Sequence, residues 1–427
     1  MSLDNNFTLE DVRRVVAGYW NGIQDRGFNS EEPIVRLHEP TFGPDEIMAA
    51  LECMLTTRIT MGPKVKAFER EYSQKFGWQH GVMVNSGSSA NLLVLAALAN
   101  QECRDRLSPG DEVIVPALSW STTVWPIIQM GLVPVVVDID PKTFNIDPNE
   151  IEKAISPKTR AVMIVPVYGN PCEMDAIVDI CERRNLTLIE DCCESMGATY
   201  DGKSVGKFGR VATFSFYYSH HITTLEGGIC NTDDTELAEL MRILRAHGWV
   251  REVEDRQPWL DRYPQIDPRF LFVNLGYNLR ATDPQGAMGS IQLPKLDGFI
   301  NNRRSTAAAY RAGLEKYGEF FSFQDETPKG FHTWFGFAII LKPSAPFGVG
   351  DITSAMNKGG VETRPIICGN IARQPALQMH EHRAVGDLAY ASNIMDSGFS
   401  FGNHQSLDDG SVKHVLSSID AFMSNYV

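Results

Sequence analysis

The spacing of hydrophobic positions predicts helices over long stretches of the chain. Four segments have apolar side chains every three or four residues, which is the spacing of one buried helix face. They are Leu9–Asp25, Pro63–Phe76, Ala90–Ala99 and Asn301–Tyr317. Short segments with a different pattern lie between the second and third of these helices and after the third.

These short segments are apolar nearly throughout and rich in β-branched residues. They are Gly81–Asn85, Glu112–Pro116, Val133–Asp138, Ala161–Pro166 and Thr187–Glu190. Strands of this kind that alternate with helices indicate a mainly parallel sheet covered by helices on both faces. We therefore predict an α/β fold, in which ligands bind beyond the carboxyl ends of the strands.

The pattern changes after about Leu293, where a smaller α/β unit is predicted. Phe335–Leu341 and Glu362–Ile367 are typical of strands in this second unit. A chain of 427 residues is long enough for one large and one small domain. We predict an N-terminal helical segment over residues 1–40, a large domain over 41–295 and a small C-terminal domain over 296–427.

Composition and charge exclude several classes of function. The net charge is −14 and no run of lysine or arginine offsets it, so a nucleic-acid partner is not expected. No uncharged stretch approaches the roughly 18 apolar residues of a membrane span. Eight cysteines without a C-x-x-C pair, and a polar N-terminus without the apolar core of a signal peptide, predict a cytoplasmic protein with reduced thiols.

Polar residues follow several of the predicted strands. The small residues from Ser86 to Asn91 would let backbone N–H groups approach a phosphate, although short Gly/Ser segments are more often plain capped turns. Asp191 ends a buried strand, where a carboxylate needs a partner or caps a helix. Trp120 could stack on a flat ligand, but an isolated tryptophan more often packs in a core.

The most informative segment is Thr213–Gly228, which has a strand-like start, a polar centre and two glycines at its end. His220 and His221 are adjacent, and neighbouring side chains of an extended chain point to opposite sides. No third ligand is spaced to join them, so we predict no metal site.

Taken in order from Gly62 to Pro365, these segments resemble the sugar aminotransferase and dehydratase family of pyridoxal-phosphate enzymes. The resemblance implies the aspartate-aminotransferase fold (fold type I), with a small C-terminal α/β domain, and a homodimer. It also implies a set of cofactor-binding residues. These are Gly87, Ser88 and Ser89 in a phosphate loop, Trp120 on the ring face, Asp191 at the ring nitrogen, Glu194 near the ring, Ser215 on the phosphate, and Asn278 reaching the neighbouring subunit's cofactor.

The chain departs from most of that family at one position, where His220 replaces the cofactor-binding lysine. An imidazole cannot form the internal Schiff base of a lysine, but it can move a proton near neutral pH. The resemblance then implies noncovalent pyridoxal or pyridoxamine 5'-phosphate and a 3-dehydratase. In that reaction the cofactor amine condenses with the C4 ketone of a nucleotide-linked 4-keto-6-deoxy sugar, and His220 removes a proton while the C3 hydroxyl leaves. L-glutamate restores the amine.

Three alternatives remain at this stage. One is a dehydratase of the ascarylose type, whose two-iron cluster needs four cysteines; only Cys193 matches, since none lies between Cys230 and Cys368. Another is an aminotransferase that uses a different lysine. The third is a noncatalytic sugar-binding protein, which the retention of Asp191 and Ser215 disfavours.

Overall fold

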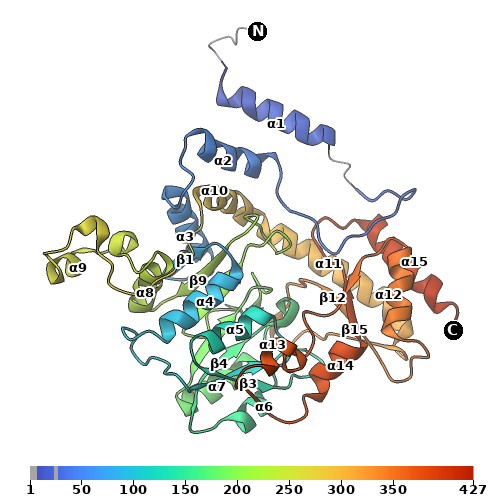
Figure 1. Ribbon diagram of the computed structural model, residues 1–427. Coiled ribbons are helices and arrows are strands. Elements are labelled where there is room, and N and C mark those ends of the chain that lie inside the picture. The colour runs from blue at the N-terminus through green and yellow to red at the C-terminus, as the bar shows by residue number, and fades with distance from the viewer. Residues whose placement is uncertain (1–6, 24–26, 427) are drawn as a thin grey trace.

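The computed structural model describes residues 7–23 and 27–426 and is built on an eight-stranded sheet (Figure 1). The strand order is β1-β9-β8-β5-β4-β2-β3-β14, and the strands from β8 to β14 run parallel. β9 is antiparallel to both of its neighbours. The strand bounds are β1 His80–Val84, β2 Glu112–Pro116, β3 Val133–Val137, β4 Thr159–Ile164, β5 Thr187–Asp191, β8 Val211–Ser215, β9 Gly228–Thr232 and β14 Arg383–Ala384.

Helices cover both faces of this sheet because its strands are apolar on both sides. In β2, Val113 and Val115 pack in one core cluster and Ile114 in another, as the alternation of side chains along a strand requires. Helices α4, α5 and α8 contribute to the first cluster, and α6 and α7 to the second. Their bounds are α4 Gly87–Leu98, α5 Ser121–Gln129, α6 Pro148–Ala154, α7 Met174–Arg184 and α8 Thr235–Arg245. The predicted α/β fold is therefore confirmed.

A third apolar cluster joins the sheet to α3, whose bounds, Pro63–Phe76, are those predicted. Phe68 and Tyr72 of this helix are fully buried against Phe214 and Phe216. The helix packs in turn on α10, which contacts α2. The bounds of these and the remaining helices are α2 Pro44–Leu55, α9 Gln257–Arg262, α10 Asp283–Gln292, α13 Pro375–Gln378 and α14 Ala389–Ser397.

The smaller C-terminal unit contains a four-stranded antiparallel sheet in the order β10-β12-β15-β13. Its strands are β10 Phe321–Phe323, β12 Phe337–Leu341, β13 Thr363–Arg364 and β15 Gly398–Phe401, and its helices are α11 Leu296–Leu314, α12 Val349–Lys358 and α15 Asp409–Met423. A separate three-stranded sheet is formed by the short strands β6 Thr199–Tyr200, β7 Lys203–Ser204 and β11 Gly330–Phe331. β14 comes from the predicted small domain but pairs with β3 of the large sheet, and the domain bounds stay a prediction.

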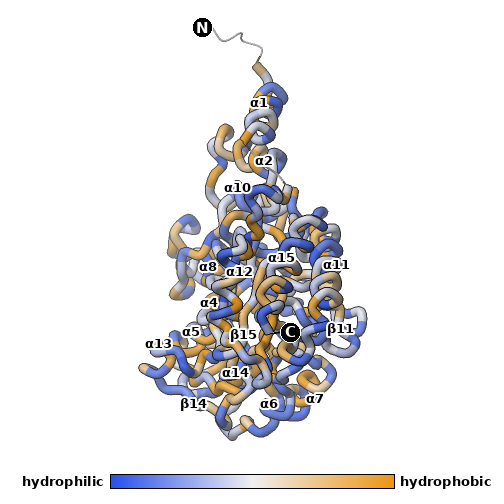
Figure 2. The backbone as a smooth tube through the Cα atoms, turned by 90° about the vertical axis from the view of Figure 1, so that its right-hand side faces the viewer, coloured by the Kyte–Doolittle hydropathy of each residue, from blue (hydrophilic) through white to orange (hydrophobic). Residues whose placement is uncertain are grey.

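Helix α1, Leu9–Ile23, lies at one end of the protein, beside α2 (Figures 1 and 2). None of its residues is buried, although it forms as predicted; residue Asp25, at the predicted end, lies outside the described residues. No helix of the described ranges is long and apolar enough to cross a membrane.

Candidate active site

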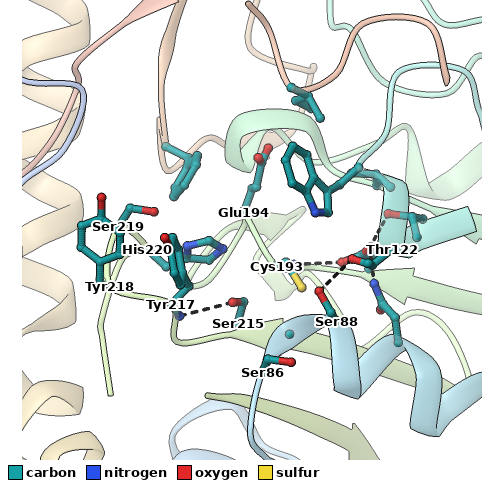
Figure 3. A pocket seen from close by; sticks show the side chains of 18 of the residues that line it. Ser86, Ser88, Thr122, Cys193, Glu194, Ser215, Tyr217, Tyr218, Ser219 and His220 are labelled. Carbon is teal, nitrogen blue, oxygen red and sulfur yellow. Dashed lines mark hydrogen bonds between the residues drawn. The ribbon is translucent and has the colours of Figure 1, made fainter. Parts of the chain in front are cut away.

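A cavity of about 490 Å³ opens at the carboxyl ends of the parallel strands (Figure 3). It brings together residues from β5, β8 and the starts of α4 and α5 with residues of the C-terminal unit. Seven of the predicted site residues line it: Gly87, Ser88, Trp120, Asp191, Glu194, Ser215 and His220. The roles assigned to them are not tested by this placement alone.

One end of the cavity is built to receive a phosphate. Helix α4 begins at Gly87, three residues before its predicted start, because Ser86 caps it and accepts a hydrogen bond from the Ser89 N–H at 3.1 Å. Gly87 and Ser88 thus lie in the first turn, where backbone N–H groups have no intrahelical acceptor and the helix dipole is positive. Such a helix end binds anions.

The glycine at this helix end is required by the space around it. A Cβ added at Gly87 would lie 2.6 Å from the Ser215 Cβ and 3.1 Å from the Cys193 Sγ. The Ser88 hydroxyl lies 3.0 Å from the Thr122 hydroxyl, and Ser215 Oγ accepts from the Tyr217 N–H at 3.3 Å. Hydroxyls of two elements therefore converge on the first turn of α4, and the loop fits the phosphate group of the expected cofactor.

Asp191, at the end of β5, is 4% exposed and held by uncharged donors. Its Oδ2 accepts from Asn91 Nδ2 at 2.8 Å and from Thr123 Oγ1 at 2.7 Å, and its Oδ1 from the Cys193 N–H at 3.3 Å. Asn91, Thr123 and the Cys193 backbone are uncharged donors, so Asp191 has no cationic partner among the described residues, and a protonated ring nitrogen would supply one. Such a carboxylate is the partner that a pyridoxal ring needs as an electron sink.

Two further side chains lie between the phosphate loop and Asp191, where a flat ring would be bound. Trp120 is 51% exposed, although it lines the cavity, so its indole offers a free face for stacking. Glu194 Oε2 accepts from the Tyr168 N–H at 3.1 Å. Burial raises the pKa of Glu194 to about 7, so this carboxyl exchanges a proton near neutral pH.

His220 lies opposite the phosphate loop, in the turn that follows β8 (Figure 3). Burial, with the nearby Arg303, His38 and Arg364, lowers the pKa of this imidazole to about 3. Its Nδ1 is buried and has no hydrogen-bond partner among the described residues. The ring is therefore neutral at pH 7, which is the form of an imidazole that accepts a proton. His221 is fully buried and does not line the cavity, as expected for adjacent residues that point apart.

The structure leaves Ser89 and Asn278 outside the residues that line the cavity. Ser89 bonds back to Ser86 through both its N–H and its hydroxyl. Asn278 is exposed, and its Oδ1 accepts from Arg280 Nε at 3.0 Å. Their roles stay predictions, and an exposed Asn278 is free to reach a second subunit.

Several residues of the cavity were not predicted as site residues. Arg364, Phe335, His38 and Tyr218 come from the C-terminal unit, the N-terminal segment and the turn after β8. Tyr218 lies two residues before His220 and could have been found from that spacing. The others are brought in by tertiary contacts between segments far apart in the chain, which no local pattern of residues indicates.

No lysine is among the described residues that line the cavity. Cys193 does line it, whereas Cys192 is buried. Within residues 7–23 and 27–426, no group of three or more histidine, cysteine, aspartate or glutamate side chains could hold a metal ion.

Fold and site together define a pyridoxal-phosphate enzyme of fold type I. The model of the DegT/DnrJ/EryC1/StrS aminotransferase family matches residues 40–420, and the chain belongs to this family. The predicted family, fold and cofactor are thereby confirmed.

The named relatives are more specific. The chain is 40% identical over 373 residues to the GDP-4-keto-6-deoxy-D-mannose 3-dehydratase of Yersinia pseudotuberculosis, covering 86% of this chain and 94% of the relative. It is 35% identical over 431 residues to the lipopolysaccharide biosynthesis protein RfbH of Salmonella typhimurium, covering 98% of both chains. A crystal structure of a GDP-4-keto-6-deoxymannose-3-dehydratase with a trapped PLP-glutamate geminal diamine superposes with a TM-score of 0.83 at 36% identity, covering 90% of this chain and 100% of that one.

Proposed function

We propose that this protein is a pyridoxal-phosphate-dependent 3-dehydratase of a nucleotide-linked 4-keto-6-deoxy sugar, with His220 as its acid/base residue. The observation that carries the proposal is a cavity that has a phosphate-binding helix end and a buried Asp191 but places His220, and no lysine of the described residues, along its wall. The 3-dehydratases among the relatives support this reaction over the alternatives.

Different residues of the cavity would bind different parts of the cofactor. The first turn of α4 and Ser215 would hold the phosphate, Asp191 the ring nitrogen, and Trp120 the ring face. When bound, pyridoxamine phosphate supplies an amine for the sugar ketone and a ring that takes up electrons. His220 is neutral at pH 7, because the pKa of its imidazole is lowered, and would remove the proton whose loss expels the C3 hydroxyl.

The substrate and the amino donor follow from the relatives' chemistry. GDP-4-keto-6-deoxymannose is the first substrate to test, since related 3-dehydratases carry that sugar in their names. L-glutamate is the proposed amino donor, because a related enzyme holds a PLP-glutamate adduct. The products would be the 3-deoxy-4-keto sugar, ammonia and 2-oxoglutarate.

The two catalytic alternatives make different demands on the site. An aminotransferase needs a lysine at the cofactor, and the described lining contains none. A dehydratase with a two-iron cluster needs four thiolates, and Cys193 is the one matching position. We therefore propose that the enzyme works without an added reductase.

We also propose a cytoplasmic homodimer with composite active sites. Three apolar side chains near Asn278 in sequence are exposed in the single chain: Phe270 at 61%, Phe272 at 52% and Leu275 at 93%. A second subunit would cover them and receive Asn278 at its cofactor. Light scattering should give a dimer, and Asn278→Ala should weaken cofactor binding while Asn149→Ala, a change at an exposed residue of α6, should not. A monomer with full cofactor occupancy would contradict the composite site.

Borohydride reduction tests the noncovalent cofactor directly. We expect the reduced protein to release all its cofactor on denaturation, and peptide mapping to find no pyridoxyl group on any lysine. The variant His220→Lys serves as the positive control, since a primary amine at this position should form a reducible Schiff base. A stoichiometric lysine adduct in the wild-type protein would contradict the proposed mechanism.

A further inference from the structure

A second histidine reaches the cavity from the N-terminal strap, which we define as residues 34–41. The strap lies beside the C-terminal unit: the Val35 N–H donates to the Gly360 carbonyl at 2.8 Å, and the Glu362 N–H donates to the Val35 carbonyl at 2.9 Å. The Leu37 N–H donates to Glu362 Oε2 at 3.0 Å. The strap is thus held by two backbone bonds at Val35 and by a bond from the Leu37 N–H to a side chain, and His38 follows immediately.

His38 lies against a tyrosine that lines the same cavity as His220. Its Nε2 is hydrogen-bonded to the Tyr218 hydroxyl, and the two rings meet edge to face with centroids 4.6 Å apart. Both residues line the cavity, and Tyr218 lies two residues before His220 in the same turn (Figure 3). The family match begins at residue 40, so His38 lies outside the part of the chain that this match covers.

The surroundings of His220 create a need for a second proton-transfer group. His220 has no carboxylate partner: its Nδ1 is buried without a partner among the described residues, and Arg303 and Arg364 disfavour a positive charge on it. If His220 alone took up a proton, the cavity would gain a charge that its neighbours repel. A donor that releases a proton in the same step would keep the total charge of the cavity unchanged.

We propose that the Tyr218 hydroxyl, held by His38, donates the proton to the departing C3 oxygen of the sugar; this inference rests on the proposed dehydratase function. The proton of the cofactor carbon that bears the amine would pass to His220, the electron pair of that C–H bond would move toward C3, and the C3–O bond would break, so that the oxygen leaves as water with the Tyr218 proton. His220 then returns the proton it accepted to the Tyr218 phenolate. No proton or electron is gained or lost by the pair of residues over the cycle.

His38 is suited to support this role through its own N–H. Burial, Arg364 and Arg303 lower the pKa of His38, while Glu362 and Glu39 oppose them, so the imidazole is neutral at pH 7 and carries one N–H. With that proton on Nε2, His38 donates to the Tyr218 oxygen and stabilises the phenolate as it forms. His38 is therefore a positioning residue, whereas Tyr218 would touch the reacting oxygen.

The experiment compares two leaving groups in the cofactor-loaded enzyme. One substrate is the nucleotide-linked 4-keto-6-deoxy sugar, and the other is its 3-deoxy-3-fluoro analogue, which expels fluoride, a much weaker base than hydroxide. Tyr218→Phe should slow loss of the hydroxyl by about 10²-fold, in the range of general-acid catalysis, and change loss of fluoride little. His220→Asn should slow both, because each reaction needs the base.

Two substitutions at His38 distinguish a role in proton donation from a purely structural role. His38→Ala should slow loss of the hydroxyl by about tenfold, and His38→Gln, whose amide can still donate to Tyr218, should recover most of that loss. Tyr390→Phe, at a tyrosine that is 51% exposed and far from the cavity lining, is the control and should leave both rates unchanged. Cofactor absorbance of each variant checks that the site is intact.

The outcomes distinguish the inference from the function on which it rests. Equal slowing of both substrates by Tyr218→Phe, or no slowing of either, would overturn Tyr218 as the proton donor while leaving the dehydratase in place. Wild-type protein that eliminated neither leaving group would overturn the proposed function, and the inference with it.

Discussion

The two walls of the active-site cavity differ in how completely their polar groups are paired. On the cofactor wall, the Asp191 carboxylate accepts three hydrogen bonds and Ser215 and Ser88 each have a partner. On the opposite wall, His220 has a buried nitrogen without a partner among the described residues, and the pKa of its imidazole is about 3. Arg303, with its pKa lowered by burial to about 9, lies behind it.

This difference indicates which wall has its polar groups paired before any ligand is bound. The polar groups of the cofactor wall are paired in this way. The opposite wall holds Arg364 and the uncharged imidazole of His220, and such a wall would favour an anionic ligand. Variants of the first wall should therefore change cofactor affinity, and variants of the second should change the rate.

The largest effect is expected at the opposite wall, from His220→Asn. Loss of the general base should lower the dehydration rate by about 10²- to 10⁴-fold. Cofactor affinity should change little, since phosphate, ring nitrogen and ring face are bound elsewhere. Product formation by mass spectrometry and cofactor titration by absorbance measure the two. If His221→Asn were the more damaging change, the base would be wrongly assigned.

At the cofactor wall, Asp191→Asn should weaken cofactor binding by about 10- to 100-fold, which is the usual worth of a charge-assisted hydrogen bond. The amide cannot balance a protonated ring nitrogen. Equilibrium dialysis with pyridoxamine phosphate gives the affinity. Asp297→Asn, at a side chain 73% exposed and paired with Lys75, is the matched control. Unchanged affinity in Asp191→Asn would contradict the pairing with the ring nitrogen.

Gly87→Ala tests how tightly the phosphate loop is packed. The added Cβ would lie 2.6 Å from the Ser215 Cβ, so we expect a loss of about 1–3 kcal/mol in the free energy of unfolding and weaker phosphate binding. Gly298→Ala in α11 is the control, because its Cβ would meet nothing within 4 Å and alanine favours a helix. Equal stability of both variants to urea would show that the loop has space for a Cβ at residue 87.

The smallest effect is expected in the pH dependence of stability, where the two walls should have opposite signs. The folded-state pKa of Glu194 is about 7, above its ordinary value of 4.5, so the folded state binds the extra proton and the free energy of unfolding falls as the pH rises from about 4.5 through 7. For His220 the folded-state pKa of about 3 lies below 6.5, so the unfolded state binds the extra proton and the free energy of unfolding rises between those pH values.

Urea unfolding of the cofactor-free wild type, of Glu194→Gln and of His220→Asn between about pH 4 and pH 8 gives each contribution as a difference in slope from the wild type. Glu194→Gln should lessen the fall and His220→Asn should lessen the rise, because Glu190, whose pKa burial raises to about 7, and His404, whose pKa burial lowers to about 3, contribute in the same two directions. If the two substitutions changed the slope in the same direction, one of the two shifted pKa values would be wrong.

The cofactor wall could be predicted from the sequence through the resemblance to the family, since the residues alone also allowed a capped turn and a helix N-cap. Asp191 ends β5, Ser215 ends β8, and Gly87 starts the helix after β1, so local pattern and sheet topology together bring them to one edge. The opposite wall could be predicted only at His220. His38 and Arg364 reach the cavity through the pairing of residue 35 with residue 361 and through β13, contacts between distant segments that no local pattern encodes. The helix starting at Gly87 was predicted three residues late because the capping role of Ser86 was not included.

The central claim is that His220, in place of lysine, directs the cofactor toward elimination at C3. Incubation in D₂O with pyridoxal phosphate, L-glutamate and a panel of nucleotide-linked 4-keto-6-deoxy sugars, followed by mass spectrometry, tests it most directly. We predict a sugar product that has lost the C3 oxygen and gained solvent deuterium at C3, together with ammonia and 2-oxoglutarate, and with no electron donor added besides L-glutamate. An amino sugar that retains its C3 hydroxyl, or a product that forms only with a reductase and NADH, would contradict the account.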